Sequence, residues 1–215
     1  MQIFDDEICM ITIFCVTLQS LMQDTYTTIA NVAEGYYTEK RSKFYAFAHH
    51  VTTPDEVKEL QQQYRKKYYD ARHVCYAYRL GPEGEDFRAN DDGEPSSTAG
   101  KPILGAMMSA GITDVVIFVI RYYGGVNLGT GGLIVAYREA SQDAIANAIL
   151  EERQVEEQIT YTFSYPMMNK VMKIVKDMQP RVVAQDFQTT CSITLSIRKS
   201  MMPQLKQKLE ALSFA

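Results

Sequence analysis

Val115-Val-Ile-Phe-Val-Ile-Arg-Tyr-Tyr123 runs directly into Gly124-Gly-Val-Asn-Leu-Gly-Thr-Gly-Gly132, and a helix-forming segment follows over residues 133–149. The first part is apolar and rich in β-branched residues, which predicts a buried strand. Five of the chain's twelve glycines fall in the second part, which predicts a loop of unusual backbone geometry. A strand, a glycine-rich loop and a helix in this order present backbone N–H groups to an anion.

Known phosphate-loop patterns do not fit this glycine-rich segment. A P-loop requires a lysine after its last glycine, and no lysine follows any of these glycines. The dinucleotide pattern G-x-G-x-x-G fails at Ile134, which stands where the third glycine is required. ATP hydrolysis and NAD binding are therefore disfavoured. Two interpretations stay open: a tight turn with close strand–helix packing, or a phosphate-binding loop.

The composition is that of an ordinary globular protein of 215 residues, 46% hydrophobic and 22% charged. A net charge of −4 gives no overall attraction to nucleic acid, although local patches remain possible. The four cysteines show no C-x-x-C spacing, which disfavours a disulfide framework and a zinc site. This usage is consistent with a reducing cytoplasm. We expect a cytoplasmic protein with no metal, no cofactor and no membrane attachment.

Residues 1–21 are predicted to be an extension upstream of the natural start at Met22. Their apolar stretch, residues 8–18, is too short to span a bilayer. The residues before it are acidic, whereas a signal peptide begins with a basic region. The sequence changes character again at residue 151, which predicts one domain over residues 22–150 and a smaller one over residues 151–215.

In the first domain, the spacing of apolar residues predicts further strands and helices around the opening segment. Thr53-Pro-Asp-Glu56 is a capping box, which predicts a helix to about residue 69. Thr98 is expected to cap a second helix that ends near residue 110. The intervening segments are interpreted as a polar turn over residues 34–43 and a long loop over residues 81–97. Strands are expected over residues 27–32, 44–51 and 73–80.

The second domain alternates strands and helices over a short length. The pattern β-α-β-β-α matches the ferredoxin-like split βαβ arrangement. Lys170, Lys173 and Lys176 form a basic stripe on its first predicted helix, interpreted as a solvated face. Strands are expected over residues 155–165, 181–187 and 190–198, and helices over residues 166–178 and 200–212.

Two groups of side chains have the types that chemistry requires. His73 and Cys75 share one face of a predicted strand, but parallel side chains make a poor hydrogen-bonded pair, so packing is the preferred interpretation for Cys75. Asp91, Asp92 and Glu94 would suit a hard cation such as Mg²⁺, but their spacing is not that of an EF-hand, and a turn around glycine is preferred. No complete set of nucleophile, base and orienting group is found.

Arg121-Tyr122-Tyr123 ends the central strand beside the glycine-rich loop. An arginine and aromatic rings beside exposed amides could hold a phosphate and stack a base. Alternatively, one tyrosine packs in the core and Arg121 pairs with a carboxylate, either Glu94 or Asp92. Both interpretations are kept.

Two long motifs resemble the IMPACT/YigZ family. They are Asp91-Asp-Gly-Glu-Pro-Ser-Ser-Thr-Ala-Gly-Lys-Pro102 and Arg121-Tyr-Tyr-Gly-Gly-Val-Asn-Leu-Gly-Thr-Gly-Gly-Leu133. The resemblance covers residues 40–147, with Arg41-Ser-Lys-Phe44 and Arg72-His73 in the same pattern. The family usually has glycine where this chain has Ser97.

The resemblance implies an α+β protein: an N-terminal ribosomal-protein-like βαβ domain followed by a ferredoxin-like βαββα domain. Eukaryotic relatives regulate translation under amino-acid stress by competing for a co-activator of an initiation-factor kinase. They use an N-terminal RWD module for this, and the two-domain bacterial type to which this chain is similar lacks that module.

The first hypothesis is a translation-linked regulator that binds RNA, the ribosome or a translation-factor partner. The alternatives are a metal-assisted hydrolase acting on a small phosphorylated or peptide substrate, and a protein-interaction module of a stress pathway. No catalytic residue is assigned, and the oligomeric state is left open. The predicted ligand-binding residues are Arg72, His73, Asp92, Glu94, Thr98, Lys101, Arg121, Tyr122, Tyr123, Gly124, Gly125, Asn127, Gly129, Gly131 and Gly132.

Overall fold

The computed structural model describes residues 24–187 and 191–213, which are of mixed α and β structure. The predicted N-terminal extension, residues 1–21, lies outside the described residues. The chain divides into two units: a larger one from Tyr26 to Arg153, and a smaller one from Gln154 onward together with Asp24 and Thr25. Among the described helices, none is long and apolar enough to cross a membrane.

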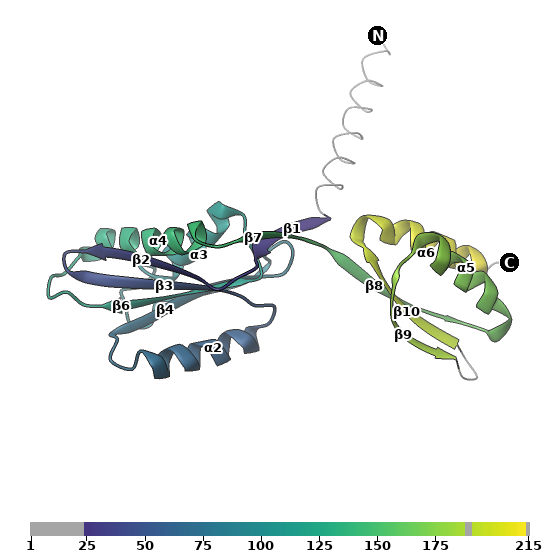
Figure 1. The fold of residues 1–215 in the computed structure, drawn as a ribbon, viewed down its shortest axis with the longest axis horizontal. Helices are drawn as coiled ribbons and strands as arrows, with labels where there is room; N and C mark the ends of the chain where they lie inside the picture. The colour runs from purple at the N-terminus through teal and green to yellow at the C-terminus, as the bar shows by residue number, and fades with distance from the viewer. Residues whose placement is uncertain (1–23, 188–190, 214–215) are drawn as a thin grey trace, which may run out of the picture. The chain divides into compact units, whose positions relative to one another are not determined.

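The larger unit is built on a five-stranded sheet in which every neighbouring pair runs antiparallel. Helix α2 (Pro54–Lys67) covers one face, and helices α3 (Gly100–Ala110) and α4 (Gly129–Ala146) cover the other (Figure 1). In sheet order the strands are β2 (Ala33–Glu39), β3 (Ser42–His50), β6 (Val115–Tyr122), β4 (His73–Leu80) and β5 (Asp86–Asn90).

Strand β6 lies at the centre of this sheet, and its first seven residues are buried, as the sequence predicts. Side chains alternate between the faces of a strand. Val115, Ile117 and Val119 therefore pack with α3 and α4, whereas Val116, Phe118 and Ile120 pack with α2. The same alternation sends Arg121 and Tyr122 to opposite faces of the sheet.

The N-cap role of Thr53 at the start of α2 is confirmed, and the Glu56 carboxylate bonds back to the residue before the cap. The Thr53 hydroxyl accepts a hydrogen bond from the Glu56 amide at 3.3 Å, and the Glu56 carboxylate accepts from the Thr52 amide at 3.0 Å. Val57 and Tyr64 of this helix are buried against the sheet. The helix ends at Lys67, two residues before the predicted end.

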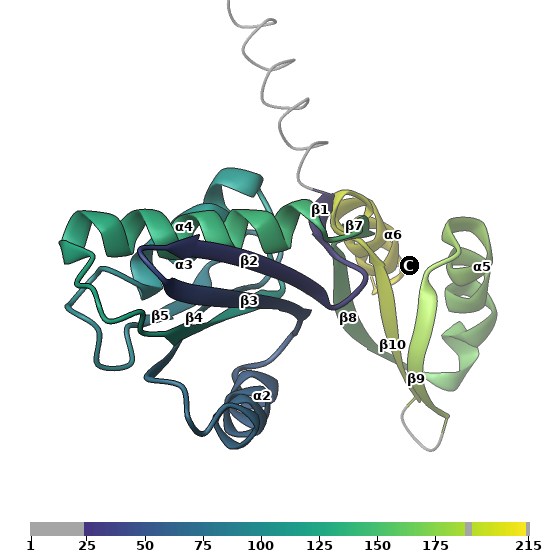
Figure 2. The ribbon, with the colours of Figure 1, turned by 60° about the vertical axis from the view of Figure 1, so that its left-hand side comes forward.

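Three local predictions for the larger unit are wrong. Residues 34–43 are not a turn, since most of them form β2, which runs alongside α4 (Figure 2). Gly35 of β2 lies directly against the α4 backbone. The predicted loop over residues 81–97 contains β5, an exposed edge strand paired with β4. Helix α4 begins at Gly129 rather than residue 133, so its first turn contains three glycines despite the low helix propensity of that residue.

Two short strands pair outside the main sheet. Strand β1 (Thr25–Ile29) pairs with β7 (Leu150–Gln154), although the sequence predicts no strand at the second position. Ala30 also donates its amide hydrogen to the carbonyl of Ile149 at 2.8 Å. The start and the end of the larger unit are therefore joined by backbone hydrogen bonds.

The smaller unit has a three-stranded sheet in the order β8-β10-β9 with two helices. Strand β10 is antiparallel to both neighbours, so β8 and β9 run parallel and are connected through α5. The core of the smaller unit includes Val171, Ile193, Leu195 and Leu205. The elements are β8 (Glu156–Phe163), η1 (Tyr165–Met167), α5 (Met168–Met178), β9 (Arg181–Phe187), β10 (Cys191–Arg198), η2 (Lys199–Met201) and α6 (Met202–Ser213).

Candidate functional site

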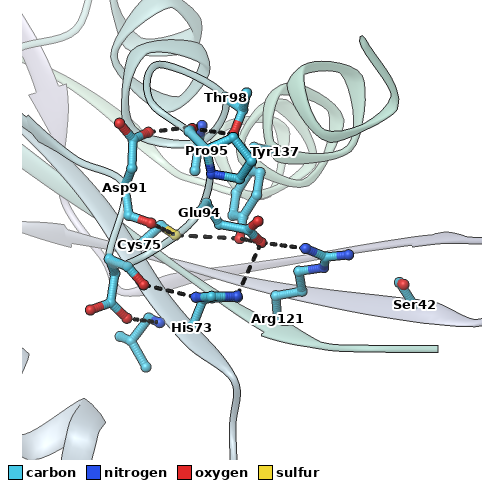
Figure 3. Close-up of polar contacts among 12 residues, drawn as sticks. Ser42, His73, Cys75, Asp91, Glu94, Pro95, Thr98, Arg121 and Tyr137 are labelled. Carbon is cyan, nitrogen blue, oxygen red and sulfur yellow. Dashed lines mark hydrogen bonds and ion pairs between the residues drawn. The ribbon is translucent and has the colours of Figure 1, made fainter. Parts of the chain in front are cut away.

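Asp91 caps helix α3, a role that the sequence assigned to Thr98. Its carboxylate accepts hydrogen bonds from the amides of Ser97 at 2.8 Å, Ala99 at 3.0 Å and Gly100 at 2.8 Å. A carboxylate at a helix N-terminus satisfies free amides and interacts favourably with the helix dipole. Thr98 is buried and donates its hydroxyl to the Pro95 carbonyl at 2.6 Å instead (Figure 3).

Asp92 also has a structural role. Its carboxylate pairs with Arg65 of α2 and accepts a hydrogen bond from the Val74 amide at 2.6 Å. Its backbone carbonyl lies 2.8 Å from His73 Nδ1. Asp92 therefore fixes the loop to β4 and orients the His73 ring.

Glu94 lies at the centre of a buried polar cluster drawn in Figure 3. Its Oε1 accepts from Arg121 Nη1 at 2.5 Å and from the Tyr137 hydroxyl at 2.9 Å. His73 Nε2 lies 3.7 Å from the same oxygen. Of the two carboxylates considered for Arg121, Glu94 is thus the partner, and the Glu94 side chain is only 3% exposed.

Cys75 and Tyr137 extend the cluster into the core. The Cys75 sulfur lies 3.1 Å from the Asp91 carbonyl oxygen and 3.3 Å from the Tyr137 hydroxyl, and its single S–H donates to one of the two at a time. Burial raises the pKa of Cys75 to about 12, so the thiol stays protonated near neutral pH. Burial likewise raises the pKa of Tyr137. Neither group supplies a nucleophile, in agreement with the packing role expected for Cys75.

His73 is held as a neutral ring with a defined tautomer. The Asp92 carbonyl can only accept, so Nδ1 carries the hydrogen and Nε2 keeps its lone pair. Burial lowers the pKa of His73, and Arg121, Arg72 and Arg65 lower it further against the opposing effect of Glu94. His73 can therefore accept a hydrogen bond at Nε2, but it adds no positive charge to the site at neutral pH.

The lowered pKa of His73 predicts a loss of stability on mild acidification. The folded state disfavours the proton that the unfolded chain binds below about pH 6.5, so the stabilisation is full above that pH and declines as pH falls. Urea unfolding at pH 7.5 and pH 6.0 should show a smaller loss for His73→Asn than for the wild type. Equal losses in the two proteins would contradict this account. The pKa of His49 is lowered by burial as well, so His49→Gln should act in the same direction.

A cavity of about 550 Å³ opens beside this cluster, in front of the first turn of α4. It brings together seven of the residues predicted from the sequence: Arg72, His73, Glu94, Arg121, Tyr123, Asn127 and Gly129. Five residues of the two quoted motifs that were not in the predicted ligand-binding set complete the lining, namely Gly93, Pro95, Leu128, Thr130 and Leu133. The other eight predicted residues do not line it: Asp92, Thr98, Lys101, Tyr122, Gly124, Gly125, Gly131 and Gly132.

The glycines of the loop have separate tasks. A Cβ on Gly124 would lie 2.2 Å from the Arg41 carbonyl carbon, so this glycine permits close packing of the loop on the β2–β3 turn. Gly125 and Gly129 have φ angles of 83° and 71°, which favour glycine. The tight-packing interpretation of the loop is supported by Gly124. The phosphate-binding interpretation is supported by the start of α4, which lines the cavity.

The N-terminus of α4 is the main feature of the cavity that favours an anion. Within the described part of the chain, neither Leu128 at the N-cap nor another side chain caps this helix, and the amides of its first turn have no partner within it. The helix dipole adds about half a positive charge there. Arg121 is buried, lines the same cavity, and among the described residues its Nε has no hydrogen-bond partner. Its guanidinium lies 5.6 Å from the centre of the Tyr123 ring.

Tyr137 is the central residue that sequence reasoning missed. It lies on the buried face of α4 with Leu133, Ala140 and Ala144. A tyrosine on an otherwise apolar helix face has a hydroxyl that requires a partner, and this signal could have indicated a buried acceptor. The identity of the acceptor, Glu94, depends on the fold.

Comparison with known proteins identifies the family of this chain. Residues 40–145 match the family described as the Impact N-terminal domain. The chain is 32% identical over 158 residues to the IMPACT family member YvyE of Bacillus subtilis, covering 74% of this chain and 73% of that protein. It is 27% identical over 172 residues to the IMPACT family member YigZ of Escherichia coli, covering 79% and 84%. The chain therefore belongs to the IMPACT family.

A solved structure is similar over both units. It is described as the crystal structure of a hypothetical protein and is 26% identical to this chain, with a TM-score of 0.70. The match covers 88% of this chain and 93% of that one.

Proposed function

We propose that this protein is a translation-related regulator that contacts its partner through a phosphate group held in the cavity. Membership of the IMPACT family supports the link to translation, because the resemblance noted above implies such a role for eukaryotic relatives. The observation that carries the phosphate proposal is the uncapped N-terminus of α4, which opens on a cavity that also holds Arg72 and Arg121.

The charges of the cavity favour a single anionic group over a long polyanion. Arg72 and Arg121 contribute two positive charges, Glu94 contributes one negative charge, and neutral His73 contributes none, which leaves +1. Amides at a helix start stabilise an anion by about 0.3–1 kcal/mol, or about 2 kcal/mol when partly buried. One phosphate thus gives weak binding, and useful affinity requires further contacts with a structured partner such as RNA, a ribosome or a translation factor.

Metal-assisted hydrolysis, the alternative function, gains no comparable support. Asp91 caps α3, Asp92 pairs with Arg65, and Glu94 pairs with Arg121, so the three carboxylates do not converge. Across residues 24–187 and 191–213, no group of three or more His, Cys, Asp or Glu side chains is placed to hold a metal ion.

The proposal extends to the fold types that the family resemblance implies. The parallel pair β8 and β9, with antiparallel β10 between them and α5 connecting them, supports a ferredoxin-like type for the smaller unit. The ribosomal-protein-like type for the larger unit rests on the resemblance alone.

Removal of Arg72 is expected to weaken association with ribosomes. Arg72 is exposed and lines the cavity, so Arg72→Ala should leave the fold intact and remove one phosphate contact. Sedimentation with ribosomes at low and high salt should show weaker binding of the variant. The slope of the logarithm of the binding constant against the logarithm of the salt concentration should become shallower by about one unit. Arg138→Ala is the matched control, because Arg138 is also exposed but does not line the cavity.

The same experiment can contradict the proposal. Binding that does not respond to salt, or that Arg72→Ala and Arg138→Ala weaken equally, would exclude the cavity as the phosphate contact. A parallel lysate pull-down with ribonuclease separates a protein partner, which survives the treatment, from an RNA partner, which does not.

A further inference from the structure

A second hollow lies on the other face of the sheet, at the same end of β6. This hollow, which we call the tyrosine groove, has a volume of about 470 Å³ and is lined only by aromatic and basic residues. The set comprises Arg41, Lys43, Tyr45, Tyr68, Tyr122 and Tyr123. None of the six is acidic, although the whole chain carries a net charge of −4.

The sheet register brings the groove residues together. Lys43 of β3 pairs directly with Tyr122 of β6, and Tyr45 lies two residues further along β3 on the same face. The Tyr45 and Tyr122 rings are 6.1 Å apart with an interplanar angle of 85°, an edge-to-face contact. The Tyr122 hydroxyl donates to Asp70 at 2.9 Å, which fixes the ring at its outer end. The rings are therefore preorganised and half-exposed.

The basic residues of the groove are also fixed by the fold. Arg41 lies in the turn between β2 and β3 with a φ of 67°, and the Gly124 backbone packs directly against it. This close approach, possible because Gly124 has no Cβ, sets the glycine-rich loop against the turn that carries Arg41. Lys43 follows at the start of β3 and is exposed.

Tyr123 connects the groove to the cavity. It lines both, and it is 47% exposed. The two residues before it point to opposite faces, since Arg121 lines the cavity and Tyr122 lines the groove. A ligand that passes around this end of the sheet thus meets a phosphate-binding arrangement on one face and tyrosine rings with cations on the other.

We propose that the tyrosine groove stacks bases of a single-stranded RNA whose backbone also reaches the cavity. This inference rests on the proposed function and names its partner as RNA. Aromatic rings bind bases of any sequence by stacking, and neighbouring Arg and Lys contact the phosphates. A proline-rich peptide also fits aromatic grooves, but it offers no anion to Arg41 and Lys43 or to the cavity.

Fluorescence anisotropy of the full chain with two labelled ligands tests the inference. One ligand is a short oligouridine, and the other is an abasic sugar-phosphate oligomer of the same length. Stacking predicts tighter binding of the oligouridine, by about 5-fold to 100-fold. Tyr122→Leu should abolish this preference, whereas Tyr122→Phe, which keeps the ring and loses only the contact with Asp70, should retain it. Thermal unfolding of each variant verifies the fold.

Four outcomes separate the two proposals. A base preference lost in Tyr122→Leu and kept in Tyr122→Phe supports the inference. Equal binding of both oligomers that Arg72→Ala weakens would overturn the stacking role and leave the phosphate cavity standing. No binding of either oligomer, with a protein partner that is still captured from lysate after ribonuclease, would overturn the RNA assignment. Displacement of bound oligouridine by a proline-rich peptide at comparable affinity would assign the groove to a protein ligand instead.

Discussion

Replacement of Arg121 by methionine is expected to lower the free energy of unfolding of the larger unit by about 3–5 kcal/mol. The Glu94 carboxylate is almost fully buried and would lose its only positively charged hydrogen-bond partner among the described residues. The Tyr137 hydroxyl alone would remain as a hydrogen-bond donor to Oε1, because His73 is neutral and 3.7 Å away. Methionine preserves much of the packing over Phe44 and Tyr123, so the loss isolates the unpaired charge.

Urea unfolding of Arg121→Met measures this effect, and Arg121→Met/Glu94→Gln provides its control. The double variant removes the buried charge, so it should recover a large part of the lost stability. A loss below about 1 kcal/mol in the single variant would mean that water reaches Glu94 and that the ion pair behaves like a surface pair.

Gly35→Ala should destabilise the larger unit by about 3 kcal/mol. An added Cβ would lie 2.3 Å from the Ala144 amide nitrogen and 2.6 Å from the Ala140 carbonyl oxygen. These are backbone atoms in the C-terminal half of α4, so no side-chain rotation relieves the overlap and the helix must move away from β2. Tyr36, whose amide donates to the Asp143 carboxylate at 2.8 Å, would lose its contact with α4 as well.

Gly105→Ala is the matched control for this substitution. Gly105 lies inside α3, and nothing surrounds its missing Cβ within 4 Å. Alanine there should stabilise the protein by about 0.5–1 kcal/mol, because it favours the helix without a clash. Thermal unfolding of both variants makes the comparison, and similar shifts in Tm for the two would refute the close packing of β2 on α4.

Elements with strong local signals were predictable from the sequence. The seven buried residues of β6 and the N-cap of α2 are set by neighbouring residues, and both were assigned correctly. Strand β2 was missed because Glu34, Tyr36 and Thr38 point outward and make the segment look like a polar turn. Its formation depends on pairing with β3 and on contact with α4, which no local pattern reveals.

Part of the candidate site was predictable because side chains alternate between the two faces of a strand, which places His73 and Cys75 on one face of β4. Glu94 and Asp92 were the two carboxylates considered as partners of Arg121. In the fold Arg121 pairs with Glu94, whereas Asp92 pairs with Arg65. The hydrogen bonds of Tyr137 with Glu94 and Cys75 join residues far apart in the sequence, so spacing alone could not predict them.

The backbone at Ser97 is consistent with the glycine that the family resemblance leads us to expect at this position. Ser97 has a φ of 66°, in the left-handed region that glycine adopts without strain. Its amide nevertheless donates to Asp91, so the helix cap is retained with serine in this position.

The pairing of β1 with β7, and of Gly35 with α4, bears on how the nascent chain folds. The first strands of the larger unit are synthesised long before their partners near residues 144 and 154. Until the ribosome has released that length, β1 lacks its strand partner β7, and β2 lacks the α4 backbone that Gly35 contacts. Folding of this unit is therefore expected to complete in a single late step during synthesis, because contacts of high sequence separation form last. A messenger truncated before the codons for β7 would leave a chain that remains sensitive to protease.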